Sequence, residues 1–229
     1  MAKVVYSPQV GDMRNKTGGA VHTKTRFGSM VRRKVSPIQP RSAAQMNVRA
    51  DFTALSKLWS DTTMDNYRAA WIALAQQYPV KDVFGAAHNL TGLQMFVRLN
   101  RALHTIAVAT ILPPPATLSV PYPGALTLAK EGGPPITSLT VDLATPPTAA
   151  EKGVIFATPP QSPGRATAGA KFRKIKIINS LTTLPTDILP EYITKFGAPP
   201  TGRQVFVQVL FTNLTTGAQS LPSEAAITV

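Results

Sequence analysis

The stretch Val205-Phe-Val-Gln-Val-Leu-Phe211 decides the fold of the second half of the chain. Its odd-numbered positions are all apolar, and Phe206 and Leu210 add apolar side chains to the other face. Because successive side chains of a strand point to opposite faces of a sheet, this alternation predicts a β-strand with one face in a core. Asn213-Leu-Thr-Thr-Gly217 follows and favours a hairpin turn into a last strand.

Further β-prone runs surround this strand and are separated by Pro and Gly residues. They span residues 118–120, 126–128, 139–143, 154–157, 172–178 and 225–229. Most of the prolines fit strand ends, edges and loops, where no backbone donor is required. Seven short strands with repeated turn signals predict a β-sandwich over residues 118–229.

The prolines also mark where the chain changes character. Four of the 21 prolines lie in residues 1–110 and the other 17 follow, beginning with Pro113-Pro114-Pro115. We therefore expect a Pro-rich linker over residues 111–117, between two differently built parts.

Three helices are expected before this linker, in a bundle over residues 42–110. Ser42-Ala-Ala-Gln45 fits a capping box that starts a helix at 43–59, Thr62-Thr-Met-Asp65 starts a second that Pro79 ends, and Thr91-Gly-Leu-Gln94 starts a third that continues toward 108. The first helix is expected to bury an apolar stripe whose positions step by four, three and four residues: Val48, Phe52, Leu55 and Trp59. Aromatic side chains recur at helical spacing and are expected in the core of the bundle: Phe52, Trp59, Tyr67, Trp71, Tyr78 and Phe96.

Residues 1–41 are expected to form a basic, extended arm with one hairpin. Ala20–Arg26 and Ser29–Val35 are β-compatible and flank Phe27-Gly28, while Pro37 and Pro40 prevent a direct continuation into a helix. Such an arm is expected to be disordered alone and to become ordered in an assembly. The fold class expected is thus α+β in two parts: a basic hairpin arm with a three-helix bundle, then a β-sandwich.

Positive charge is concentrated at the N-terminus. The 229 residues carry a formal charge of +13, and residues 1–49 alone hold four Lys, six Arg and one Asp. Such a segment suits an acidic protein surface, which we favour, or nucleic acid phosphates, and a merely solvated charged face is the third alternative. The residues expected to bind a partner are Lys16, Lys24, Arg26, Phe27, Arg32, Arg33, Lys34, Arg41 and Arg49.

The same sequence offers little for catalysis. It has no Cys, its three histidines (His22, His88 and His104) lack metal-ligand spacing, and no nucleophile elbow or phosphate-binding glycine loop occurs. We therefore expect no enzyme activity, no catalytic residue, no cofactor and no metal site. No apolar segment has the length of a signal peptide core or a membrane span, so no membrane partner is expected either.

The N-terminal half resembles a family of largely uncharacterised phage and prophage proteins. The resemblance covers residues 10–104 and lies in Arg14-Asn-Lys16-Thr-Gly18-Gly19-Ala-Val21, Arg32-Arg33, Gln45-Met-Asn-Val-Arg49-Ala-Asp-Phe52-Thr-Ala-Leu-Ser56-Lys-Leu-Trp59, Arg68-Ala-Ala-Trp71 and Thr91-Gly92-Leu-Gln94-Met-Phe96. Members of this family tend to end in a domain that looks like a fibronectin type III module, and Gly202–Val209 and Thr216–Pro222 are similar to such a module.

The resemblance implies a virion-associated structural protein, assembled in the host cytoplasm. We expect a decoration (cement) protein or a minor capsid or neck protein, which binds major capsid or neck–tail proteins through the basic arm and self-associates in a symmetric assembly. One alternative is a DNA-binding virion or packaging protein that uses the same arm on phosphates. Another is a sugar-binding domain, which the lack of Trp after Trp71 disfavours, since only Tyr122, Tyr192 or Phe residues would remain as aromatic platforms.

Overall fold

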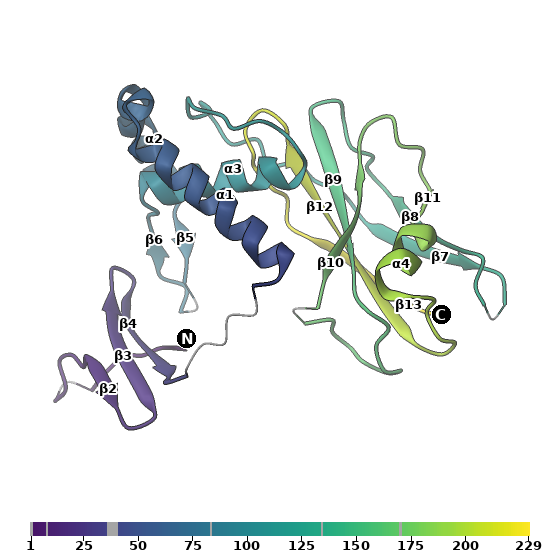
Figure 1. The fold of residues 1–229 in the computed structure, drawn as a ribbon, viewed down its shortest axis with the longest axis horizontal. Coiled ribbons are helices and arrows are strands. Elements are labelled where there is room, and N and C mark those ends of the chain that lie inside the picture. The colour runs from purple at the N-terminus through teal and green to yellow at the C-terminus, as the bar shows by residue number, and fades with distance from the viewer. Residues whose placement is uncertain (1, 8, 36–40, 83, 134, 170) are drawn as a thin grey trace. The chain divides into compact units, whose positions relative to one another are not determined.

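The computed structural model describes residues 2–7, 9–35, 41–82, 84–133, 135–169 and 171–229 (Figure 1). It contains both helices and antiparallel sheets, which confirms the mixed α+β class. The chain divides into two compact units, Met1–Met95 and Phe96–Val229. This division lies inside a helix, whereas the proline distribution predicts a boundary at residues 111–117.

The N-terminal unit begins with a four-stranded antiparallel sheet. The expected hairpin is present as β3 (Ala20–Thr25) and β4 (Gly28–Arg33), with Phe27 in the turn. β1 (Ala2–Lys3) pairs with β4 and β2 (Asn15–Thr17) pairs with β3, which gives the order β1-β4-β3-β2. The expected hairpin is therefore part of a larger sheet, because β1 and β2 supply backbone partners on both sides of it.

The three expected helices are all present. α1 spans Ala43–Ser60, and the amide of Gln45 donates to the Ser42 hydroxyl, which confirms the N-terminal cap. A short 3-10 turn, η1 (Thr62–Met64), leads into α2 (Asp65–Gln77), and the hairpin β5 (Val80–Lys81) and β6 (Ala87–His88) leads on to α3 (Gly92–Thr105).

Gly92 allows the start of α3 to approach α2 closely. A Cβ at this position would lie 2.8 Å from Ile72 Cγ1 and 3.0 Å from Trp59 Cη2. A side chain would therefore overlap its neighbours, and the Thr91-Gly92 pair serves packing as well as capping. The cap itself is reciprocal, since the Gln94 amide donates to the Thr91 hydroxyl and the Thr91 amide donates to the Gln94 side chain.

The C-terminal unit contains two antiparallel sheets. The first has the order β10-β9-β12-β13, with β9 at Glu151–Ala157, β10 at Arg173–Ile178, β12 at Gln204–Asn213 and β13 at Ser223–Thr228. The second has the order β11-β8-β7, with β7 at Leu126–Glu131, β8 at Ser138–Leu143 and β11 at Thr186–Asp187.

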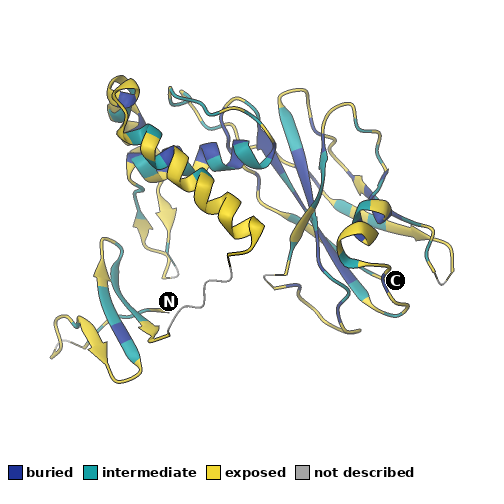
Figure 2. Ribbon diagram, viewed as in Figure 1, coloured by how far each residue is buried: buried dark blue, intermediate teal, exposed yellow. Residues whose placement is uncertain are grey.

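Side chains from both sheets form one core. Leu139 and Val141 of β8 lie in the same buried cluster as Ile155 of β9 and Val207 of β12. Figure 2 shows that β9 and β12 carry long buried stretches. The other face of β9 is also covered, because Val154 packs with Leu103 and Ile106 at the end of α3. Coverage on both faces explains why residues 153–157 of β9 include no polar side chain.

Three features of this unit differ from the prediction. The short strand β11 pairs with β8 at a place where no strand is expected. Residues 118–120 form no strand, because Pro121 and Pro123 remove backbone donors just after them, and the first strand starts at Leu126. A helix, α4 (Leu189–Phe196), lies where none is expected. Pro190 in its first turn and Gly197 directly after it, at φ 82°, are the residues that favour such a short helix.

Candidate functional site

The sequence-predicted cations lie mainly on the N-terminal sheet, and strand register divides them between its two faces. Val21 pairs across the sheet with Lys16 and with Arg32, so these side chains share one face. Arg33 pairs with Ala20 and therefore lies on the other face. Both faces of the sheet are thus basic.

Only part of this charge is neutralised within the protein. The Asp12 carboxylate forms ion pairs with Lys24, whose Nζ lies 3.2 Å from Oδ2, and with Arg14, whose Nε lies 3.3 Å from the same oxygen. Burial by itself would raise the pKa of Asp12, but the Lys24 hydrogen bond and charge, with those of Arg14, outweigh it and lower the pKa. By contrast, four exposed cations have no ion pair with any residue that the structure describes: Lys16, Arg32, Arg33 and Lys34.

The hairpin tip makes contacts inside the N-terminal unit. Arg26 Nη2 donates to the backbone oxygen of Asn89 at 2.6 Å, and the Phe27 ring stands edge-on to the His88 ring with 5.3 Å between centroids. The Arg26 guanidinium also lies 5.3 Å from the centroid of the Phe27 ring. Both residues therefore help to hold the sheet against the β5–β6 hairpin, a role that the sequence does not reveal.

Asp82 is the second connection between these elements. Its carboxylate accepts hydrogen bonds from Lys3 Nζ, from His88 Nε2 at 2.9 Å, and from the amides of Phe84 and Ala86 at 2.8 and 3.0 Å. The Lys3 hydrogen bond, reinforced by the other donors against desolvation, holds the pKa of Asp82 well below its usual range. Because these donors use the lone pairs of its carboxylate, Asp82 has a structural role and is not free to bind a ligand.

The last two expected binding residues lie at and on α1. Arg41 is exposed and precedes the helix cap at φ 48°, and Arg49 is exposed on the helix. Of the predicted apolar stripe, Leu55 is only 1% exposed and Trp59 is half-buried, but Phe52 is 55% exposed. The stripe is therefore covered only in the second half of the helix (Figure 2).

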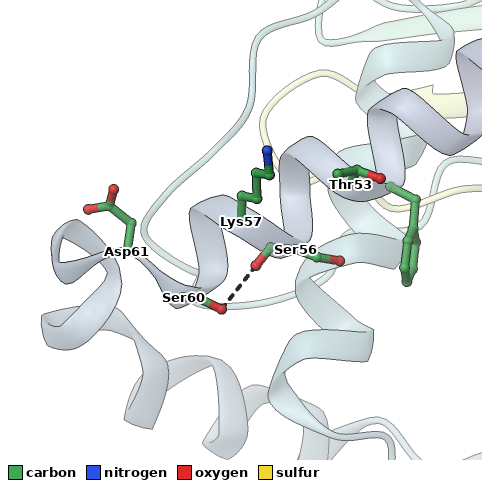
Figure 3. Close-up of a pocket in the computed structure, with 6 residues that line it drawn as sticks. Thr53, Ser56, Lys57, Ser60 and Asp61 are labelled. Atoms are coloured by element: carbon green, nitrogen blue, oxygen red, sulfur yellow. Dashed lines mark hydrogen bonds between the residues drawn. The ribbon is translucent and has the colours of Figure 1, made fainter.

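Two hollows lie along the exposed side of α1, and Figure 3 shows the residues that line one of them. One, of about 530 Å³, is lined by Phe52, Thr53, Ser56, Lys57, Ser60 and Asp61. The next, of about 480 Å³, is lined by Met46, Arg49, Ala50, Thr53, Ala54 and Lys57. Since Thr53 and Lys57 line both, the hollows form one surface that combines exposed apolar side chains with Arg and Lys. Sequence periodicity assigns Phe52 to the core and so misses this surface.

All three histidines are half-buried and have polar partners. His22 Nδ1 lies 2.9 Å from the Tyr6 hydroxyl, His88 contacts Asp82, and His104 Nε2 lies 2.9 Å from the Thr110 hydroxyl. Among the described residues, no three His, Cys, Asp or Glu side chains are grouped so that they could hold a metal ion. Within that same part of the chain, no helix has the length and apolar character needed to cross a membrane.

The N-terminal sheet and the exposed side of α1 together form the candidate binding surface of this protein. Comparison with protein-family models, with curated proteins and with solved structures finds no match to this chain.

Proposed function

We propose that this chain is a non-enzymatic structural protein of a bacteriophage particle. It acts as a decoration or minor head–neck protein, and it binds capsid or neck–tail proteins through the N-terminal sheet and α1. Its location is accordingly the virion, and copies arranged by the symmetry of the particle multiply weak contacts through effective concentration. The resemblance of residues 10–104 to phage proteins supports the setting.

One observation carries the binding role: the exposed cations of β2 and β4, together with Lys34 directly after β4, which no described carboxylate neutralises. Lys16, Arg32, Arg33 and Lys34 leave both faces of the sheet positive. Arg residues in particular form paired hydrogen bonds with carboxylates, which suits an acidic protein surface.

The exposed side of α1 favours a protein over DNA as the partner of this unit. Phe52 and Met46 are 55% and 47% exposed, and Arg49 and Lys57 lie beside them along the same hollows. Protein interfaces bury apolar and aromatic anchors within a polar rim, whereas phosphate contacts require only charge. A partner with an apolar patch surrounded by carboxylates fits this surface.

We also propose how the helices and the sheets of the protein are arranged. The three helices of residues 42–110 form the bundle, and the C-terminal sheets form a fibronectin type III-like sandwich. The strand partition supports the sandwich: β7, β8 and β11 share one sheet, and β9, β12 and β13 lie in the other. In immunoglobulin-like sandwiches the first, second and fifth strands likewise oppose the third, sixth and seventh.

The test compares two variants of the full chain for binding to DNA-free capsid shells and to isolated tails of the parent phage. Arg32→Gln/Arg33→Gln/Lys34→Gln removes three of the unpaired cations, and Lys81→Gln/Lys130→Gln/Arg203→Gln removes the same charge elsewhere. We expect the first variant to bind about tenfold more weakly than the control, since three exposed ion pairs at roughly 0.5 kcal/mol each amount to one decade.

Two results would refute this function. Equal binding by the two variants would show that the N-terminal cations are only solvated charge. Binding to duplex DNA that the first variant loses, with no affinity for shells or tails, would instead assign these cations to phosphates, with log affinity falling about 0.9 per neutralised phosphate against log salt.

A further inference from the structure

A second group of cations lies in the C-terminal unit. The net charge of the whole chain does not reveal this group, because acidic residues elsewhere in the unit offset it. Residues 165–176 contain Arg165, Lys171, Arg173, Lys174 and Lys176 and no acidic residue. Among the described residues, 165–169 and 171–172 lie in a loop, and 173–176 belong to β10, an edge strand of the four-stranded sheet. Of the five cations, only Lys176 has a carboxylate partner among the described residues.

Two of these cations are held together by a neutral group. Arg165 Nη1 lies 3.3 Å from Gln161 Oε1, and Lys171 Nζ lies 2.9 Å from the same oxygen. Gln161 is 6% exposed, and its backbone pairs with that of Gln204 through hydrogen bonds of 2.8 and 3.1 Å, which fix the loop to β12. Two like charges therefore converge on a rigid amide oxygen rather than on a carboxylate.

The basic group continues along the outer edge of β10 and onto α4. Arg173 and Lys174 are consecutive in the strand and therefore lie on opposite faces of the sheet, on either side of that edge. Lys174 Nζ donates to the backbone oxygen of Thr105 at 2.9 Å, and Lys195 Nζ donates to the backbone oxygen of Lys174 at 2.5 Å. Arg173 donates to a backbone oxygen as well. These contacts orient the side chains without cancelling their charge. Lys176 differs, because it forms an ion pair with Glu191 at 2.9 Å.

We propose that Arg165, Lys171, Arg173, Lys174 and Lys195 form a binding surface for the phosphate backbone of a nucleic acid. We name it the β10 surface. Five cations with no carboxylate partner among the described residues repel one another, and a run of phosphates relieves that repulsion. The site is independent of the N-terminal surface and does not rest on the function proposed above.

A phosphate backbone fits the β10 surface better than a protein does. Between the cations of residues 165–176 lie the small residues Ala166-Thr-Ala-Gly169 and the half-buried Phe172 and Ile175, while Ile193 of α4 is 43% exposed. The segment thus presents five cations but few apolar side chains that could anchor a protein interface. Strand addition is also disfavoured, because the register of β10 shifts between Lys174 and Lys176 and interrupts the regular ladder. A surface in which cations outnumber exposed apolar side chains is the pattern of sequence-independent backbone binding.

The experiment measures binding of a 30-base-pair duplex DNA to the full chain over a salt series. Lys171→Gln/Arg173→Gln/Lys174→Gln is compared with the control Lys81→Gln/Lys130→Gln/Arg203→Gln, which has the same net charge. Both are also made in the Arg32→Gln/Arg33→Gln/Lys34→Gln background, so that DNA bound by the N-terminal sheet does not conceal the effect. Thermal unfolding midpoints verify that all variants are folded.

We expect the β10 variant to bind the duplex at least tenfold more weakly than the control near 0.1 M salt, with a log–log salt slope less steep by roughly 2 to 3. Equal affinities and slopes for the two variants would overturn the proposal and leave these cations as protection of an edge strand. Binding of polyglutamate in preference to the duplex would also overturn it, in favour of an acidic protein. Neither result depends on whether the chain binds shells or tails.

Discussion

At the scale of single residues, Asp82 makes the sharpest prediction. Its side chain is only 13% exposed and accepts hydrogen bonds from Lys3 and His88, and its pKa is lowered by these donors. A carboxyl group whose pKa is lower in the folded state contributes stability above its unfolded pKa of about 3.9. That stability is lost as the pH falls through the folded value.

The Asp82→Asn variant tests this linkage. We expect the wild-type protein to be more stable than the variant at pH 7, and the difference to shrink on acidification below about pH 4, because the unfolded carboxylate then takes up a proton first. Urea unfolding at several pH values measures it. If the difference in the free energy of unfolding between the two proteins stayed constant from pH 7 to pH 2, the structural role of the Asp82 carboxylate would be ruled out.

Residue roles were predictable from the sequence where they depend on near neighbours. The Ser42–Gln45 cap involves atoms three residues apart, and the sequence pattern identifies it correctly. Phe27 shows the limit of such patterns. The sequence places it at a hairpin tip and offers it as an anchor for a partner, but its ring packs on His88, 61 positions further along the chain. Only the tertiary fold brings the two rings together.

At the scale of secondary-structure elements, α1 has two differently exposed halves. Its apolar stripe of Val48, Phe52, Leu55 and Trp59 predicts one continuous buried face, yet Phe52 is 55% exposed while Leu55 is 1% exposed. Helical periodicity specifies which residues share a face but not how far along the helix that face is covered. The uncovered half is the part that we assign to a partner.

Paired substitutions in α1 test this difference. We expect Leu55→Ala to destabilise the protein by about 2 to 5 kcal/mol, because it leaves a cavity in the core. Phe52→Ser should change the stability by no more than roughly 0.5 kcal/mol, as for other exposed positions, while weakening attachment to the partner. Urea unfolding of each variant supplies the comparison. A large loss of stability in Phe52→Ser would mean that the protein itself covers this ring.

Strands were predictable where apolar alternation is long and uninterrupted. β12 was predicted correctly from Val205–Phe211, since all four odd-numbered positions of this stretch are apolar and it contains no Pro or Gly. Leu118–Val120 offers only three positions beside Pro121, too few to compete with the loss of backbone donors. Pro190 and Gly197 mark the two ends of α4, but the 8 residues of this helix are too few to show a helical periodicity in the sequence.

At the scale of the whole molecule, sums over the chain conceal local charge. The total of +13 and the N-terminal excess direct attention to residues 1–49, while residues 165–176 hold five cations and no acid in the other unit. The sequence was sufficient to show this second cluster. The structure adds that Arg165 and Lys171 converge on Gln161, which a linear count of charges does not show.

Each unit also has a core of its own, and this predicts how the molecule unfolds. Leu55 and Trp71 are buried in the N-terminal unit, and Val207 is buried among the side chains of both sheets in the C-terminal unit. We expect two calorimetric transitions, because separate cores lose their packing independently. Leu55→Ala should lower the midpoint of one transition, and Val207→Ala should lower that of the other, each by several degrees. If both substitutions lowered the midpoint of a single transition equally, the two units would unfold as one cooperative structure. The helix α3, which is continuous through Met95 and Phe96, would then be the element that couples their unfolding.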